Sequence, residues 1–340
     1  MGAGTAAALG MSEMLAQRGH AASTGRAVVC VYLLGGHDSN NLIVPLESPA
    51  YDSYVNGRGS LALPRESLLA VDSGGSGKFG FHPSLAGLRD LYNQNALAIL
   101  ANVGPASMNS SYNPPHVRYV PGGYMGVDWS VPSVTPLARG VSMAGTRMSS
   151  ERGKDLAMAV RAAGAAGSFP DTVFGRGLEQ IARALRLGAV SETVFTVPIG
   201  GYFGHRREVD LYSTLDKGLT AFYRFLHDQG LANRVTIYTD TEFNRTLVPN
   251  AHGNSDPAWG GHQLILGGSV LGGRIYGKFP SLEVGGPDDA AGNGTWRPTT
   301  LDLQYTATLA QWHGTVGLDT LPGYEGLNSV AQKRLDFLTA

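Results

Sequence analysis

Histidine and carboxylate side chains gather just after the apolar segments of this sequence, in short glycine-rich stretches. His37 and Asp38 follow one apolar run, His205 follows another, and Asp240 and Glu242 follow a third. Imidazole and carboxylate groups are the ligands that zinc and related divalent ions take in proteins. These residues therefore indicate a divalent-metal site, although aspartate in a glycine-rich loop is also a common turn former.

A further glycine-rich stretch carries His252, Asp256 and His262, and we expect all three to lie in one loop. The sequence contains no short zinc motif such as His-Glu-x-x-His. A metal site would therefore have to be assembled from segments that are far apart in the chain.

The elements that must position these residues alternate between strands and helices. Continuous apolar runs rich in β-branched residues predict strands buried on both faces, over residues 27–34, 96–103, 193–199 and 234–239. Apolar residues at helical spacing predict helices over residues 84–95, 178–187, 211–226 and 299–313. This alternation favours parallel βαβ units, and therefore an α/β fold with a mostly parallel central sheet. Ligands of such sheets bind beyond the carboxyl ends of the strands, where the histidines and carboxylates fall.

The remaining segments are shorter or less regular. Residues 42–45 predict a short extended piece, and residues 270–279 predict a hairpin around Gly272-Gly273. Residues 104–170 are rich in glycine, proline and serine and predict loops. Since no long linker interrupts the pattern, we expect one domain over residues 27–340 after a leader at residues 1–26.

Composition excludes two classes of partner. The formal net charge is −1 and the basic residues are scattered, so the sequence has no basic stripe for nucleic acid. The longest apolar stretches, such as residues 27–34, are too short to span a bilayer. The single cysteine, Cys30, lies inside an apolar run and is expected to be a buried small hydrophobe.

The first residues suggest an export signal. Residues 2–9 are small and apolar, and residues 17–22 end on small residues, as in the apolar and cleavage regions of such signals. A short disordered or helical leader is the alternative.

Several segments resemble the bacterial DUF1501 family. They are Leu33–Pro45, Phe79–Leu85, Thr241–Thr246, Trp259–Gly268, Gly272–Gly277 and Trp296–Thr300. The resemblance runs from about Ala27 to Leu338. It implies an alkaline phosphatase-like, sulfatase-like fold with a mostly parallel central sheet sandwiched by helices. It also implies twin-arginine export, and hence a periplasmic or extracellular location.

The resemblance assigns roles to individual positions. The metal ligands that it implies are Asp38, His205, Asp256 and His262, with zinc as the first choice of ion. Ser110 lies where a nucleophile or phosphate contact is expected, with Ser107 and Ser111 as alternatives. Judged from the residue types alone, Glu242 and Arg245 could form an ion pair that fixes the loop after residue 239, or could bind an anionic substrate, with Arg245 holding the anionic group.

This sequence departs from the family pattern at the metal site. Phe203 stands where the family has aspartate and Pro257 where it has histidine. Neither side chain can ligate a metal, so a two-metal site would lack two ligands. The four remaining ligands could form one mononuclear site, with His252 or His37 as substitutes.

Two functions therefore follow as expectations. The first is a metal-dependent hydrolase of phosphate or sulfate esters, acting on a small molecule or a glycan. The second is a non-catalytic secreted binding or assembly protein derived from the same fold, whose protein partner the sequence does not identify.

Overall fold

The computed structural model describes residues 25–105, 159–160, 162–188, 193–200, 208–241, 243–314, 330 and 332–339. The α-helices are α2 (Ala50–Arg58), α3 (Ala86–Asn93), α7 (Val173–Arg186), α8 (Glu208–Asp228) and α9 (Asp302–His313). The strands are β1 (Ala27–Leu34), β2 (Ile43–Pro45), β3 (Leu69–Asp72), β4 (Lys78–Phe81), β5 (Leu97–Gly104), β6 (Thr193–Gly200), β7 (Val235–Thr241), β8 (Asn244–Arg245), β9 (Pro257–Ala258), β10 (Gly261–Leu266), β11 (Ile275–Tyr276) and β12 (Thr300–Leu301).

The central sheet is mixed but mostly parallel, in the order β11-β5-β10-β7-β1-β6, with β12 also paired to β5. β1 pairs in parallel with β6 over residues 27–34 and with β7 over residues 27–33. Among the described strands of this sheet, only β10 runs antiparallel to its neighbours, β5 and β7. The prediction of an α/β fold with a mostly parallel sheet is confirmed, and the carboxyl ends of β1, β5, β6 and β7 share one edge.

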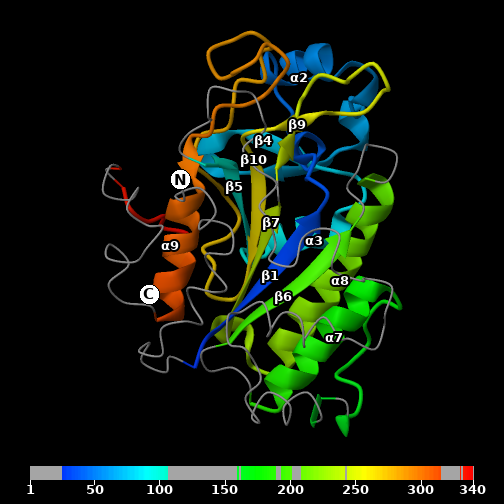
Figure 1. Cartoon of the computed structure of the whole chain (residues 1–340), viewed down its shortest axis with the longest axis vertical. Coiled ribbons are helices and arrows are strands. Elements are labelled where there is room, and N and C mark those ends of the chain that lie inside the picture. Colours follow the sequence, from blue (N-terminus) through cyan, green and yellow to red (C-terminus); the bar gives the residue numbers. More distant parts are fainter. Residues whose placement is uncertain are drawn as a thin grey trace, which may run out of the picture.

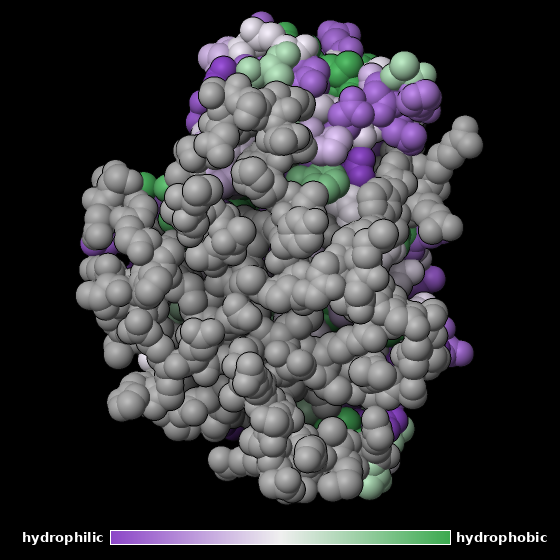
Figure 2. All heavy atoms as spheres, in the orientation of Figure 1, coloured by the Kyte–Doolittle hydropathy of each residue, from purple (hydrophilic) through white to green (hydrophobic). Residues whose placement is uncertain are grey.

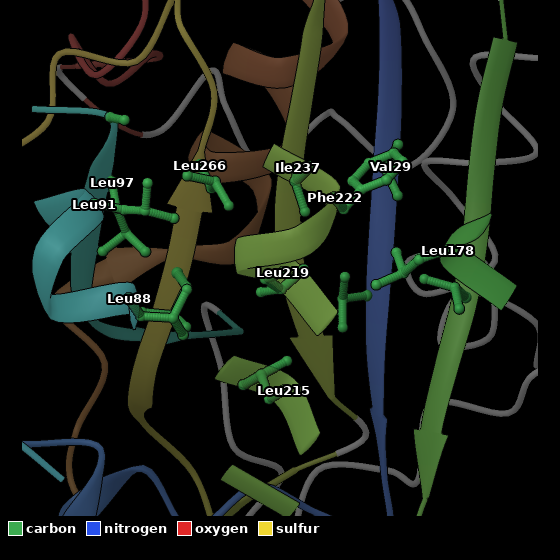
Figure 3. Packing of buried hydrophobic residues seen from close by; sticks show 14 of the residues in the cluster. Val29, Leu88, Leu91, Leu97, Leu178, Leu215, Leu219, Phe222, Ile237 and Leu266 are labelled. Carbon is green, nitrogen blue, oxygen red and sulfur yellow. The ribbon is translucent and has the colours of Figure 1, made fainter. Parts of the chain in front are cut away.

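Helices cover both faces of this sheet. α3, α7 and α8 pack on one face, and α9 packs on the other (Figure 1). On the first face, Leu215, Leu219 and Phe222 of α8 point toward Val29 and Ile237 in the strands (Figure 3). Successive side chains of β1 point to opposite faces of the sheet. Val29 therefore packs on the face covered by α8, and Val28 and Cys30 pack on the face covered by α9. A strand buried on both faces must be apolar at every position, and this requirement explains the continuous run that identified β1.

Two small sheets lie beyond the carboxyl edge. β2, β4 and β3 form an antiparallel three-stranded sheet, and β8 pairs with β9. Together with α2 they bring distant loops over the end of β1 (Figure 1). Where described residues are visible at the top of the same view, the surface is mostly hydrophilic (Figure 2). Among the described residues, no helix is both long and apolar enough to cross a membrane.

Two local predictions were wrong. Residues 270–279 do not form a hairpin, because β11 pairs in parallel with β5 and the amide of Gly272 donates to the carbonyl of Asn95. His262 does not lie in a loop, because it belongs to β10, a fully buried strand in the sheet. The sequence does not predict this strand, because Gly260-Gly261 and the polar pair His262-Gln263 interrupt the apolar pattern.

The start of α7 gives a first testable prediction. Thr172 precedes the helix in an extended conformation, and its hydroxyl oxygen accepts a hydrogen bond from the amide of Gly175 at 2.9 Å. Thr172→Ala should lower the free energy of unfolding by about 1 kcal/mol because that amide loses its partner. Urea denaturation would measure the loss. Thr172→Ser keeps the acceptor and should stay within a few tenths of a kcal/mol, so an equal loss in both variants would contradict this role.

Candidate functional site

A buried polar cluster lies where β1 ends, and Asp38 is at its centre. Asp38 is 3% exposed and follows Gly35 and Gly36, which both have positive φ. The backbone amide of His37 donates to the carbonyl of Phe243, which ties this turn to the segment after β7. The turn after β1 and the segment after β7 therefore lie side by side at the carboxyl edge of the sheet.

Both oxygens of the Asp38 carboxylate accept hydrogen bonds. Arg58 Nη2 donates to Oδ2 at 2.6 Å, and Ser255 Oγ donates to the same oxygen at 2.8 Å. Asn40 Nδ2 donates to Oδ1 at 3.2 Å. Burial raises the pKa of Asp38, but the Arg58 charge and the three hydrogen bonds outweigh burial and hold that pKa below its usual value. Asp38 is therefore an ionised carboxylate whose charge is balanced by Arg58.

Arg58 is the cation of this pair and is completely buried. It comes from the last turn of α2, and its Nε donates to Asn41 Oδ1 at 3.0 Å. Its Nη1 donates to the backbone carbonyls of Thr246 and Leu247 at 3.2 and 3.1 Å. Every guanidinium nitrogen thus donates a hydrogen bond within the protein, as a buried cation requires.

Two buried histidines flank the pair in their neutral form. Burial lowers the pKa of His37 to about 4, with Asp38 opposing this shift and Arg245 adding to it. Burial also lowers the pKa of His262 to about 3, and His37 adds to the effect. The amide of His262 donates to Ser39 Oγ at 2.8 Å, which places His262 beside the turn that carries His37 and Asp38.

The hydrogen bonding of His262 defines its tautomer. The backbone amide of Asn102 donates to His262 Nδ1 at 3.2 Å, and the ring stacks on Phe279 with centroids 4.4 Å apart. Because Nδ1 accepts a hydrogen bond, the single proton of the neutral ring lies on Nε2. In this arrangement neither nitrogen of His262 has a lone pair available for a metal.

Arg245 is also buried, at 6% exposure. Its Nη2 and Nη1 donate to the backbone carbonyls of Gly35 and Ser255, both at 2.7 Å, and its Nε donates to Gly36 at 3.3 Å. These bonds tie the turn after β1 to the loop between β8 and β9. Glu242, its predicted partner, lies outside the described residues.

The other predicted site residues are dispersed. Asp256 is on the surface, where its Oδ1 accepts from Asn250 Nδ2 at 2.8 Å. Asp256 is nevertheless next to Ser255, which contacts Asp38. His205 and Ser110 lie outside the described residues, as do the departure at Phe203 and the two alternative serines. Within the described ranges, no three histidine, cysteine or acidic side chains are grouped so as to hold a metal.

A small pocket opens at the same edge of the sheet, between α9 and the carboxyl ends of β5 and β7. Its volume is about 40 Å³. Asp240 and Thr241 line it from β7, Trp259 lines it from the segment after β9, and Asp302 and Tyr305 line it from α9. This is where ligands bind in open α/β sheets.

The buried histidines predict how stability depends on pH. Burial lowers the pKa values of His37 and His313 to about 4, and that of His262 to about 3. In the unfolded chain a histidine takes up its proton near pH 6.5. Between that pH and about 4 the unfolded state therefore binds more protons, and stability falls on acidification, at most by about 1.4 kcal/mol per pH unit for each histidine.

Urea denaturation at several values between pH 7 and pH 5 would measure this slope. In His262→Gln this slope should fall by up to about 1.4 kcal/mol per pH unit, because one histidine fewer takes up a proton on unfolding. Equal stability at both ends of the range would contradict the neutral, buried state of these rings.

The comparison with known protein families gives one result. Residues 142–291 match the family described as "Protein of unknown function (DUF1501)". No curated protein and no solved structure matches the chain. The DUF1501 match includes the segments Thr241–Thr246, Trp259–Gly268 and Gly272–Gly277, but Leu33–Pro45, Phe79–Leu85 and Trp296–Thr300 lie outside it. The resemblance is therefore supported over a shorter range than the sequence analysis predicts.

Sequence reasoning missed the residues that complete the Asp38 cluster and the pocket. They are Asn40, Arg58, Asn102, Ser255 and Asp302. Arg58 lies in an unremarkable segment twenty residues after Asp38, so only the fold brings the two together. Two acidic residues could have been noticed: Asp240 ends an expected strand, and Asp302 begins an expected helix.

Proposed function

We propose that this chain is a non-catalytic binding protein built on a hydrolase-like α/β fold. One observation carries the proposal: the Asp38 carboxylate is paired with Arg58, a fully buried arginine, at 2.6 Å. The Arg58 guanidinium group lies where a metal ion would have to lie to be bound by Asp38. Each of its nitrogens donates a hydrogen bond. Asp38 then stabilises the turn after β1 instead of holding an ion.

The state of the other predicted ligands supports this proposal. The Nδ1 lone pair of His262 accepts the amide of Asn102, and the Asp256 carboxylate is on the surface beside Asn250. Among the described residues no three histidine, cysteine or acidic side chains are grouped as metal ligands, and His262 has no lone pair to offer, so these residues do not fit a divalent metal. The departures at Phe203 and Pro257 point in the same direction. The fold remains, and its pocket at the carboxyl edge becomes the binding site.

We also propose that the protein acts outside the cytoplasm. The apolar start of the sequence, with its resemblance to a twin-arginine signal, supports this location. Cell fractionation of a full-length, epitope-tagged chain tests it, and a cytoplasmic signal alone would refute it.

Metal content is the direct test of the binding function. Elemental mass spectrometry of the purified protein, before and after incubation with zinc, manganese or calcium, should find no stoichiometric metal. Aryl phosphates, phosphodiesters and sulfate esters should not be cleaved. One equivalent of metal that disappears in Asp38→Ala would refute the proposal, and Asp72→Ala, a change at the end of β3, is the matched control.

A second candidate is the metal-dependent hydrolase with one reduced site. The observation that favours it is the gathering of His37, Asp38 and His262 at the carboxyl end of β1. In that case Asp38, His205, Asp256 and His262 would hold one divalent ion, zinc first. Ser110, Glu242 and Arg245 would then act on a phosphate or sulfate ester.

Restoring the missing ligands separates this candidate from the first. The double variant Phe203→Asp, Pro257→His should acquire metal or ester hydrolysis if the fold is a decayed enzyme. It should acquire neither if the Asp38–Arg58 pair has replaced the metal. Isothermal titration with zinc, with each single variant as control, measures the difference.

A further inference from the structure

Four oxygen atoms from two distant segments of the chain surround the guanidinium group of Arg58. Asp38 Oδ2 accepts from Nη2 at 2.6 Å, and Asn41 Oδ1 accepts from Nε at 3.0 Å. The backbone carbonyls of Thr246 and Leu247 accept from Nη1 at 3.2 and 3.1 Å. These four acceptors, here termed the oxygen cage, carry one negative charge among them. They therefore suit a planar cation whose donors point outward in several directions.

The Asp38 side of the oxygen cage is held by bonds that do not involve Arg58. Ser255 Oγ donates to Asp38 Oδ2 at 2.8 Å, and Asn40 Nδ2 donates to Asp38 Oδ1 at 3.2 Å. Asn40 Nδ2 also donates to the carbonyl of Arg245 at 2.8 Å, which fixes the amide that holds the carboxylate. The carboxylate therefore has the same orientation imposed on it from two other sides.

The Asn41 side is fixed in the same way. The Tyr54 hydroxyl donates to Asn41 Oδ1 at 2.9 Å. Asn41 Nδ2 donates to the carbonyl of Leu61 at 3.2 Å, so the amide cannot turn over without placing its oxygen against another oxygen. Asn41 therefore presents its oxygen to the cage whether or not Arg58 is there to donate.

The two backbone carbonyls belong to residues whose amides are bonded elsewhere. The amide of Thr246 donates to the carbonyl of Asp256 at 2.8 Å, and the amide of Leu247 donates to the carbonyl of Gly294 at 3.1 Å. These bonds anchor the segment on either side of the two acceptors. All four walls of the oxygen cage are thus organised by contacts that would remain if the Arg58 side chain were shorter.

The dimensions of the oxygen cage favour a guanidinium group over a metal ion. Each oxygen is 2.6–3.2 Å from the nitrogen that donates to it, and the centre of the guanidinium group lies farther away than that nitrogen. Ca²⁺, the divalent ion that prefers oxygen, takes about six to eight ligands at about 2.3–2.6 Å. A metal ion at the centre would therefore require the cage to contract.

We propose that the oxygen cage is a binding site for an alkylguanidinium cation, and that Arg58 fills it as a ligand supplied by the chain itself. This inference rests on the proposed function in taking Asp38 as the partner of Arg58 and not of a metal ion. Because the walls are held independently, the site persists when the Arg58 side chain is shortened. An external alkylguanidinium then binds in its place, since the cost of organising the acceptors is already met.

Ethylguanidinium tests the site, because it contains the atoms that Arg58→Ala removes. At 10 mM it should raise the folding equilibrium constant of Arg58→Ala about tenfold, as expected for a ligand that binds the folded state with a dissociation constant of about 1 mM. Urea denaturation with and without the compound measures this constant. A gain below about twofold would overturn the proposal.

Two matched compounds test what the site recognises. Ethylurea has nearly the same shape as ethylguanidinium but no charge, and ethylammonium has the charge without the fork of donors. Each should raise the folding equilibrium constant of Arg58→Ala by less than about twofold at 10 mM. A gain with either compound equal to that with ethylguanidinium would overturn the guanidinium specificity that we propose.

Two variants locate the effect. Arg65→Ala removes the same atoms from the half-exposed pair of Arg65 with Asp52, so ethylguanidinium should not stabilise it measurably. The double variant Arg58→Ala, Asp38→Asn lacks the carboxylate, and its gain from ethylguanidinium should fall below about twofold because the charge-assisted hydrogen bond is lost. A tenfold gain in either variant would place the cation elsewhere and overturn the proposal.

The test also applies if Arg58→Ala is unfolded in buffer. Trimethylamine N-oxide is then added until circular dichroism shows about half of the protein folded, and the same compounds are compared there. Failure of the proposed function is separable: a stoichiometric metal in the wild-type protein that is lost in Asp38→Ala would refute that function whatever the guanidinium result. A metal-free wild-type protein whose Arg58→Ala variant gains nothing from ethylguanidinium would overturn this inference alone.

Discussion

Arg58→Met should lower the free energy of unfolding by about 3–5 kcal/mol, because it leaves the buried Asp38 carboxylate without its cation. Arg58 is completely buried and also holds two backbone carbonyls of the segment after β8, which would lose their donor. Urea or guanidinium chloride denaturation measures the loss. A loss below about 1 kcal/mol would show that the pair does not organise this end of the sheet.

The chain offers a matched control in a second arginine–aspartate pair. Arg65 and Asp52 are 3.6 Å apart with side chains about half exposed, so Arg65→Met should cost no more than about 1 kcal/mol. A double variant, Arg58→Met with Asp38→Asn, removes both charges. It should lose less stability than the two single changes added together, because no uncompensated charge remains.

Asp289→Ala should lower the free energy of unfolding by about 3 kcal/mol, the second large effect that we expect. The Asp289 carboxylate is 6% exposed and accepts five backbone amides of its own loop. Those amides belong to Gly285, Ala291, Gly292, Gly294 and Thr295. Without the carboxylate, the buried amides of Gly294 and Thr295 would lack an acceptor. Thermal and urea unfolding would measure the loss.

Asparagine should be a poor substitute at this position. Oδ1 accepts three of the amides and Oδ2 accepts two, so either orientation of an asparagine side chain points its NH₂ group at backbone N–H donors. Asp289→Asn should therefore cost nearly as much as Asp289→Ala. Asp288→Asn is the control, since Asp288 accepts only Ser281 and Lys278 in the described contacts and should cost less. A harmless Asp289→Asn would contradict this account of the loop.

The sequence predicts those elements whose burial requires an unbroken run or a regular spacing of apolar residues. β1 has the predicted bounds because a strand buried on both faces must be apolar throughout. β6 begins where predicted, and α8 covers the predicted stripe. β10 is equally buried but carries His262 and Gln263, whose Nδ1 and Oε1 atoms accept hydrogen bonds from Asn102 and Thr239. Such compensation depends on tertiary structure, so pattern reasoning places this strand in a loop.

The candidate site, too, is predicted from the sequence only in part. The turn after β1 is visible in the sequence as Gly35-Gly36 followed by polar residues, and its position at the carboxyl edge follows from the parallel sheet. The pairing of Asp38 with Arg58 does not follow, because it depends on how α2 folds back over that edge. The hairpin expected at residues 270–279 failed for a similar reason, since β11 finds its partner in β5 rather than in its neighbour.

The parallel pairing of β1 has a consequence for how the protein is made. β1 ends at residue 34, but its two partners begin at Thr193 and Val235. Since ribosomes add about 5–20 residues per second, β1 waits on the order of ten seconds after its synthesis before a native neighbour exists. During that interval an entirely apolar strand with both edges open is in contact with water, the state in which nascent chains aggregate or are held by chaperones. In any fragment that ends before residue 235, β1 lacks its partner β7 and keeps one edge open. Such truncated forms should therefore be insoluble, even where their own helices are formed.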